Sequence, residues 1–194
     1  MVQIKNLKIY ELTESINACR NAMRTDLPDY YSDEEFNRSF ARAKSLCKTP
    51  SNSGEANFLT GIRVAFDIIY PNYFSPELQR YHWIDIVTSS SKMHKLSSIV
   101  MAGSFNKYVS SENIENMRIL AANFNADPTY ENRMKLISNC PQGIELFMRV
   151  NTNYMQLKNI YHQRKNHRLK EDWGMFCSMI ENLPYFEEFI NTRA

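Results

Sequence analysis

One ten-residue segment, Gly61–Tyr70, places the strongest constraint on how this chain folds. Strict alternation of side chains over such a length is typical of a half-buried β-strand, because successive residues of a strand point to opposite faces. The segment Gln3–Leu12 shows the same period more weakly. The alternating apolar residues of the stronger segment are Ile62, Val64, Phe66 and Ile68, separated by Arg63, Ala65, Asp67 and Ile69.

Most of the remaining chain has the helical period of apolar residues. The sequence Ser32-Asp33-Glu34-Glu35 is a capping box, which predicts a helix from there to about Cys47. The segment Glu77–Thr88 is predicted to be helical or extended, and Tyr185–Ile190 to be a closing amphipathic turn. Further helices are predicted over Glu14–Arg24, Ser89–Met101, Ser111–Asn123, Thr129–Asn139, Ile144–His167 and Asp172–Asn182.

These patterns predict a helix-dominated α+β fold with a small sheet, and the length of 194 residues predicts a single domain over residues 1–194. With 43% hydrophobic and 23% charged residues the composition is that of an ordinary globular protein. The five glycines are too few for a Gly-rich phosphate loop. A net charge of +2 is too balanced for a protein that binds nucleic acid over its whole surface.

The sequence also predicts where the protein works. It has no apolar run near the ~20 residues of a membrane span, and its first residues alternate instead of forming a secretion signal. We therefore expect a cytoplasmic protein of a bacterial or phage-infected cell, without membrane contact. The four scattered cysteines, Cys19, Cys47, Cys140 and Cys177, are then expected to be free thiols, and no structural metal is expected.

Two polar clusters are candidate binding sites. The first runs from Gln79 to Lys95 and contains Arg80, Ser90 and Lys92, a set suited to an anion because a guanidinium, a hydroxyl and an ammonium all donate hydrogen bonds. A solvated loop and helix face is the alternative.

The second cluster is the predicted helix around Asn153–Arg168. Asn153, Lys158, His162 and Lys165 are expected on one polar face, and Arg164 and His167 point together as an i, i+3 pair. The alternatives are a basic helix end favoured by the helix dipole, or basic residues with interleaved tyrosines that grip nucleic acid.

Together the two clusters resemble the flavin-dependent thymidylate synthase family, over about Lys5 to Ile190. The family has an Arg-His-Arg signature followed at fixed spacing by Ser, Asn/Glu, Ser and Arg, and an alternating strand that ends in proline before it. Downstream it has Asn, Leu and Arg at fixed helical spacing. The matching positions are Pro71, Arg80, Tyr81, His82, Asp85, Val87, Thr88, Ser90, Lys92, Asn153, Leu157 and Arg164.

The resemblance implies a homotetramer that holds FAD and dUMP in clefts between subunits and transfers a methylene group from a folate. It implies that Arg80 and Arg164 form two walls of an anion site for the nucleotide, with Ser90 and Lys92 between them. Tyr81, His82 and Asn153 would line the flavin, and Glu55 takes the place of the family's histidine near the flavin ring.

Two hypotheses of different classes follow. In the first, the chain is a divergent flavin-dependent thymidylate synthase or a related pyrimidine-nucleotide enzyme, with FAD as cofactor. In the second, it is a non-catalytic binding protein on the same fold, without a cofactor, such as a phage accessory or counter-defence factor with a protein partner. The changes at Glu55 and Thr88 favour the second hypothesis, and the retained cations Arg80, Lys92 and Arg164 favour a nucleotide or small anionic ligand in both. An unrelated helical nucleic-acid-binding protein is the third alternative, and the catalytic residues are not identified.

Overall fold

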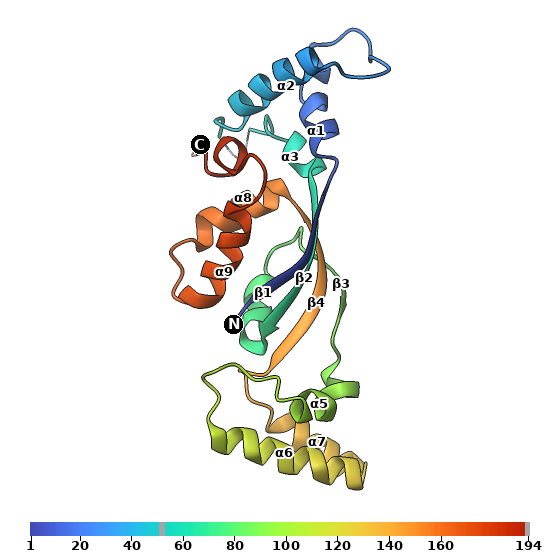
Figure 1. Cartoon of the computed structure of the whole chain (residues 1–194), viewed down its shortest axis with the longest axis vertical. Helices are drawn as coiled ribbons and strands as arrows, with labels where there is room; N and C mark the ends of the chain where they lie inside the picture. The colour runs from blue at the N-terminus through green and yellow to red at the C-terminus, as the bar shows by residue number, and fades with distance from the viewer. Residues whose placement is uncertain (51–52, 193–194) are drawn as a thin grey trace.

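The computed structural model describes residues 1–50 and 53–192, and it is built around an antiparallel sheet. The strands are β1 (Gln3–Tyr10), β2 (Arg63–Pro71), β3 (Asp85–Ser89) and β4 (Glu145–Asn153), in the spatial order β1-β2-β4-β3. The sheet forms the middle of an elongated molecule, with helices at both ends (Figure 1).

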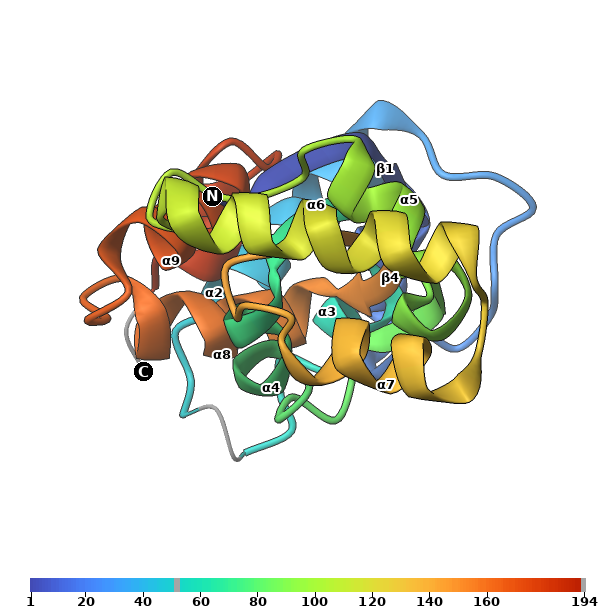
Figure 2. The same cartoon turned by 90° about the horizontal axis from the view of Figure 1, so that it is seen from below.

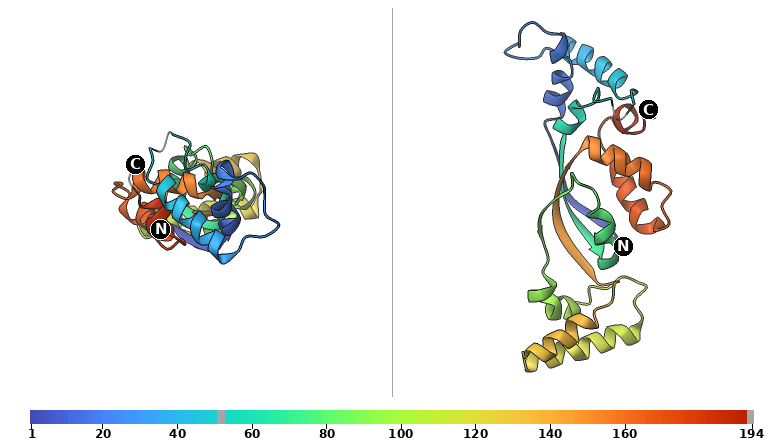
Figure 3. Two further views of the ribbon diagram at one scale, coloured as in Figure 1. Left: turned by 90° about the horizontal axis from the view of Figure 1, so that it is seen from above. Right: turned by 180° about the vertical axis from the view of Figure 1, so that it is seen from behind.

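One face of the sheet carries the main apolar core. Alternate residues of β2 and β4 point into it, and helices α8 (Tyr154–Arg164) and α9 (Lys170–Glu181) cover it (Figure 3). Phe176 of α9 packs edge-on against Phe66 of β2, with ring centroids 5.9 Å apart. On the other face, which no helix of the described chain covers, Arg149 pairs with Asp67 at 3.2 Å and Phe147 is 60% exposed.

The first end of the molecule contains the helices α1 (Leu12–Ala18), η1 (Asn21–Met23), α2 (Asp33–Leu46) and α3 (Phe58–Gly61). The hydroxyl of Ser32 accepts a hydrogen bond from the backbone N–H of Glu35 at 3.3 Å, so the serine half of the predicted capping box forms, whereas the Glu35 carboxylate accepts from Arg24 at 3.4 Å. The short π-helix η3 (Phe186–Ile190) packs against α2, with 5.6 Å between the ring centroids of Phe40 and Phe189.

The opposite end is a layer of three helices, α5 (Lys92–Met101), α6 (Ser111–Ala126) and α7 (Tyr130–Ser138), seen from below in Figure 2. They enclose a second, smaller apolar cluster, separate from the core under the sheet. Between β2 and β3 the chain forms η2 (Asn72–Phe74) and the one-turn helix α4 (Ser75–Leu78). The smaller cluster consists of Leu96, Val100, Met117, Ala121, Leu136 and Ile144.

The predicted α+β fold with a small sheet is confirmed, but the single long helix predicted over Ile144–His167 is wrong. The structure has strand β4 followed by helix α8 in this segment. Leu146, Val150 and Tyr154 are four residues apart, which fits one face of a helix and also one face of a strand. The buried Met148 and Thr152 lie between them and show that the true period is two.

The polar face predicted for this segment is also wrong at Lys158, which is only 4% exposed. Its ammonium donates hydrogen bonds to the backbone carbonyl of Cys47 at 2.8 Å and to the Thr192 hydroxyl at 2.7 Å. Burial lowers the pKa of Lys158, because a charged ammonium is poorly solvated there. The lysine thus joins α8 to the end of α2 and to the C-terminal segment.

Candidate functional site

The candidate site is centred on Arg164, the last residue of α8, whose guanidinium makes polar and aromatic contacts. Its Nε donates a hydrogen bond to the hydroxyl of Tyr81 at 2.7 Å, and its Nη1 lies 2.8 Å from Oε2 of Glu77. The face of the guanidinium lies over the ring of Trp173, 4.7 Å from the ring centroid. These contacts hold the guanidinium in one orientation and leave its side chain 14% exposed.

The partners of Arg164 come from two segments outside α8. Glu77 lies on α4, which has a proline in its first turn, and Tyr81 follows directly after this helix. Trp173 lies in the first turns of α9 and is fully buried, with its ring centroid 4.7 Å from that of Phe74. Because Trp173 is fixed by packing, it fixes in turn the position of the arginine above it.

A cleft of about 420 Å³ opens beside Arg164, at the connection between α8 and α9. His167 lies at its edge, with Nε2 3.6 Å from the same Glu77 oxygen. The indole N–H of Trp173 is buried and makes no hydrogen bond within the described chain. A cleft with this lining favours an anionic ligand, because it offers several hydrogen-bond donors and positive charge. Its walls are Arg164, Lys165, Asn166, His167, Lys170, Trp173 and Gly174.

Of the predicted site residues, the structure brings together Arg164, assigned to the nucleotide, and Tyr81, assigned to the flavin side, whereas Arg80 does not line the cleft. Arg164 meets Tyr81, so the end of α8 and the segment that carries Arg80 and His82 are neighbours, although 83 positions separate the two bonded residues. Arg80 and His82 are both exposed beside the buried Tyr81. Arg164 and His167 point together as predicted, in that both side chains contact Glu77, but the helix predicted to carry both is wrong at this end, because α8 stops at Arg164.

Ser90 and Lys92 lie elsewhere in the same chain. Ser90 exchanges hydrogen bonds with the backbone of Phe147: its N–H donates to the carbonyl at 2.8 Å, and its hydroxyl accepts from the N–H at 3.1 Å. Lys92, the first residue of α5, donates to the side chain of Asn72 at 2.8 Å. These bonds attach both residues to the end of the sheet next to the helical layer, and none of them is made to Arg164.

The four residues assigned to the flavin side come from three segments, because Tyr81 and His82 are neighbours between α4 and β3. The amide oxygen of Asn153 accepts from the N–H of Gln156 at 2.9 Å and caps α8, and the Tyr81 hydroxyl bonds Arg164 and also Gln163. His82 and Glu55 are exposed on different loops. In the described residues no hydrogen bond joins any two of these four side chains, so they do not form one connected site within a single chain.

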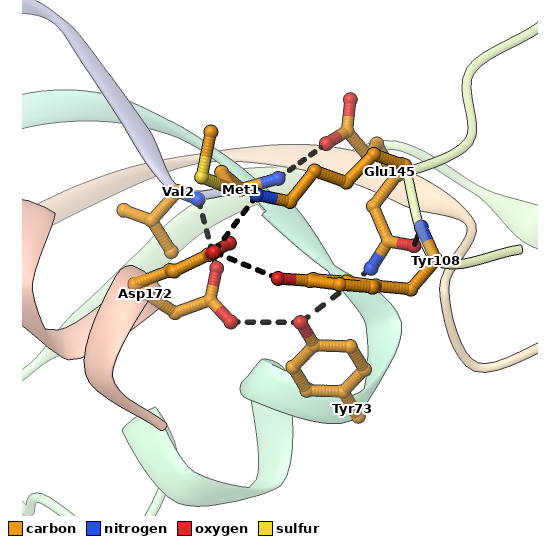
Figure 4. A network of polar contacts seen from close by, with 9 residues as sticks. Met1, Val2, Tyr73, Tyr108, Glu145 and Asp172 are labelled. Atoms are coloured by element: carbon orange, nitrogen blue, oxygen red, sulfur yellow. Dashed lines mark hydrogen bonds and ion pairs between the residues drawn. The ribbon is translucent and has the colours of Figure 1, made fainter. Parts of the chain in front are cut away.

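A second polar network lies on the other side of the α8–α9 connection (Figure 4). The carboxylate of Asp172 accepts from the backbone N–H of Val2 at 3.0 Å and from the hydroxyl of Tyr73 at 2.7 Å. Burial, together with this carboxylate, raises the pKa of Tyr73. The amine of Met1 lies 2.6 Å from Glu145. The network holds the start of α9 against β1 and η2, and so helps to position Trp173 one residue further on.

Sequence reasoning missed Glu77 and Trp173. Glu77 precedes Arg80 by three residues and lies directly after Pro76, but nothing local relates it to a helix near residue 164. Its pairing depends on the tertiary packing that brings α4 to the end of α8. In the described residues we find no cluster of His, Cys, Asp or Glu placed to hold a metal ion, and all four cysteines are free thiols. None of the helices described has the length and hydropathy needed to cross a membrane.

Comparison with solved structures shows which fold this is. A crystal structure of the flavin-dependent thymidylate synthase of Helicobacter pylori, complexed with FAD and dUMP, superposes with a TM-score of 0.75 and 15% sequence identity. The match covers 99% of this chain and 100% of that one. The chain has the flavin-dependent thymidylate synthase fold. The resemblance inferred from the sequence is confirmed at this level.

Two further structures share the flavin-dependent thymidylate synthase fold with this chain. A second crystal structure of the Helicobacter pylori enzyme with FAD and dUMP gives a TM-score of 0.73 at 14% identity and 98% coverage of both chains. A UMP/dUMP methylase from Streptomyces cacaoi, bound with 5-Br dUMP, gives 0.67 at 11% identity and covers 100% of this chain and 98% of that one. No protein-family model and no curated protein sequence matches the chain.

Proposed function

We propose that the chain binds a pyrimidine nucleotide monophosphate of the dUMP type in the cleft beside Arg164. The observation that carries this proposal is the full-length likeness of fold to a synthase complexed with dUMP and to a methylase bound with 5-Br dUMP. The positive lining of the cleft supports it, because each charge-assisted hydrogen bond to a phosphate contributes roughly 1.5–3 kcal/mol.

In this proposal Arg164 and Arg80 are walls of the nucleotide site. Ser90 and Lys92 are bound to the far end of the sheet in their own chain, so a second copy supplies them. Together with the family resemblance, this leads us to include a homotetramer with clefts shared between subunits in the proposal. Assembly is supported by Ile86, Val87 and Phe147, which are all exposed on the neighbouring strands β3 and β4, because several large apolar side chains close together on a surface favour contact with another subunit.

Titration calorimetry with dUMP tests the site. Arg164→Ala is expected to weaken binding about tenfold or more, since it removes a charge-assisted contact, and Arg80→Ala is expected to weaken it as well. Arg164→Lys should recover only part of the loss, because an ammonium does not replace the planar fork of a guanidinium. Arg118→Ala, on the exposed side of α6, removes the same charge outside the cleft and serves as the control. Unchanged affinity in both Arg164→Ala and Arg80→Ala would refute the proposal.

Flavin chemistry is a separate part of the proposal. An enzyme of this kind retains FAD, with Tyr81, His82, Asn153 and Glu55 near it in the assembled protein, and is yellow when purified. The second candidate is a non-catalytic nucleotide- or protein-binding chain on the same fold. It is favoured by the commitment of the Tyr81 hydroxyl and the Asn153 amide oxygen to bonds inside the chain. A visible absorption spectrum of the purified protein, before and after addition of FAD, separates the two.

A further inference from the structure

A carboxylate of the same chain lies next to the positively charged cleft, in contact with two of the residues that line it. Glu77 Oε2 lies 2.8 Å from Nη1 of Arg164 and 3.6 Å from Nε2 of His167, so one oxygen faces two of the groups that would attract an anion. The contact with Arg164 is an ion pair by distance, and the oxygen accepts no hydrogen bond of good geometry. The attraction is therefore mainly Coulombic, and it is strengthened because the two side chains are only 14% and 25% exposed.

The carboxylate competes for the part of Arg164 that a ligand needs. The guanidinium already donates through Nε to Tyr81 and rests with its face on Trp173. Its Nη groups remain for a ligand, and Glu77 lies against one of them. A phosphate bound there would be within a few ångströms of the carboxylate, where like charges repel strongly in a partly desolvated site.

Glu77 is also held in this place by the fold. It lies on the single turn α4, between Phe74 and Leu78, and both of these side chains are fully buried. The backbone of the turn is therefore anchored, and only the side chain of Glu77 can move away from Arg164.

We propose that Glu77 is a specificity-determining residue: an intramolecular competitor that lowers the affinity of the Arg164 cleft for phosphate groups and leaves its affinity for uncharged nucleosides unaffected. This inference rests on the proposed nucleotide site. In this role of Glu77, a ligand with a phosphate group reaches the guanidinium of Arg164 only when the Glu77 side chain moves away. The opposite role, in which Glu77 serves only to orient Arg164 for the ligand, makes the opposite prediction for the same variant.

The test measures binding of three probes, dUMP, inorganic phosphate and deoxyuridine, to the full chain and to Glu77→Gln. The amide keeps the size of the side chain and removes its charge. We expect Glu77→Gln to bind dUMP and phosphate about tenfold more tightly and deoxyuridine with unchanged affinity. Combining Glu77→Gln with Arg164→Ala should abolish the gain. Glu112→Gln, at an exposed position of α6, removes one negative charge outside the cleft and controls for net charge.

The outcomes are distinguishable. Equal or weaker binding of dUMP by Glu77→Gln, while Arg164→Ala still weakens it, overturns the competitor role and leaves the proposed function standing. An equal gain in Glu112→Gln also overturns it, since the effect is then one of net charge. If neither Arg164→Ala nor Arg80→Ala alters dUMP binding, the proposed function itself fails. Glu77→Ser, checked by its melting temperature, gives the same measurement should the glutamine variant not fold.

Discussion

Cys47 provides a direct test of how tightly the junction of α2, α8 and the C-terminal segment is packed. The residue is fully buried at the end of α2. Burial raises the pKa of its thiol from 9.0 to about 12, although the charge of Lys158 acts in the opposite direction. The unfolded chain releases this proton at a lower pH than the folded chain, so stability is complete below pH 9 and falls as the pH rises toward 12.

The size of the effect follows from the two pKa values. Between pH 8 and pH 10 the linkage relation gives a loss of about 1.4 kcal/mol in the free energy of unfolding from this thiol alone. Cys47→Ala removes the titrating group and leaves a small cavity whose cost does not depend on pH. The loss of stability between pH 8 and pH 10 should therefore be about 1.4 kcal/mol smaller in Cys47→Ala than in the unmodified protein.

Urea unfolding under reducing conditions at pH 8 and pH 10, followed by tryptophan fluorescence, measures the loss of unfolding free energy in the unmodified protein and in Cys47→Ala. Cys140→Ala is the comparison variant. Burial raises the pKa of the Cys140 thiol as well, but this thiol is only partly buried and has other neighbours than Cys47. Equal pH-dependent losses in the unmodified protein and Cys47→Ala would show that the thiol is solvated, and would refute the packing described at this junction.

Two further measurements test the fold and the assembly. Asn153→Ala removes the cap of α8 and should lower the free energy of unfolding by about 1 kcal/mol in urea, whereas Asn151→Ala, two residues earlier on β4, should have a smaller effect; equal effects would contradict the capping role. Light scattering should give a mass near four times the 22.8 kDa of one chain, and a single-chain mass across the micromolar range would exclude the homotetramer.

The fold could be predicted wherever a local pattern has one structural solution. Ser32 precedes the first turn of α2, and a helix begins there because the Ser32 hydroxyl accepts a hydrogen bond from the exposed backbone N–H of Glu35. The alternating apolar residues around Phe66 likewise predict the strand β2. The prediction of a helix directly after Ile144 is wrong because residues spaced by four fit both the helical period and the strand period. Only the pairing with β2 and β3 decides in favour of a strand.

The candidate site was predictable only in part. Arg164 and His167 are three positions apart, but α8 ends at Arg164, so the connection after the helix, and not helical geometry, turns both side chains toward Glu77. Their common partner, Glu77, is 87 positions away from Arg164, and no local rule relates the two. The helical spacing of Lys158 from His162 and Lys165 predicts that it lies on a polar face. Its burial depends on the carbonyl of Cys47, which tertiary packing alone brings within reach.

The bond between Val2 and Asp172 spans 170 positions of the chain, and this has a consequence for the order of folding. Contacts between residues so far apart in sequence form slowly, because a very long loop must close before they contribute any stability. The helical layer α5–α7 can form from local contacts, but β1 is fixed to α9 only when almost the whole chain is available. The first strand and the last long helix therefore complete the fold together, and partial opening of the native protein should release them as one unit.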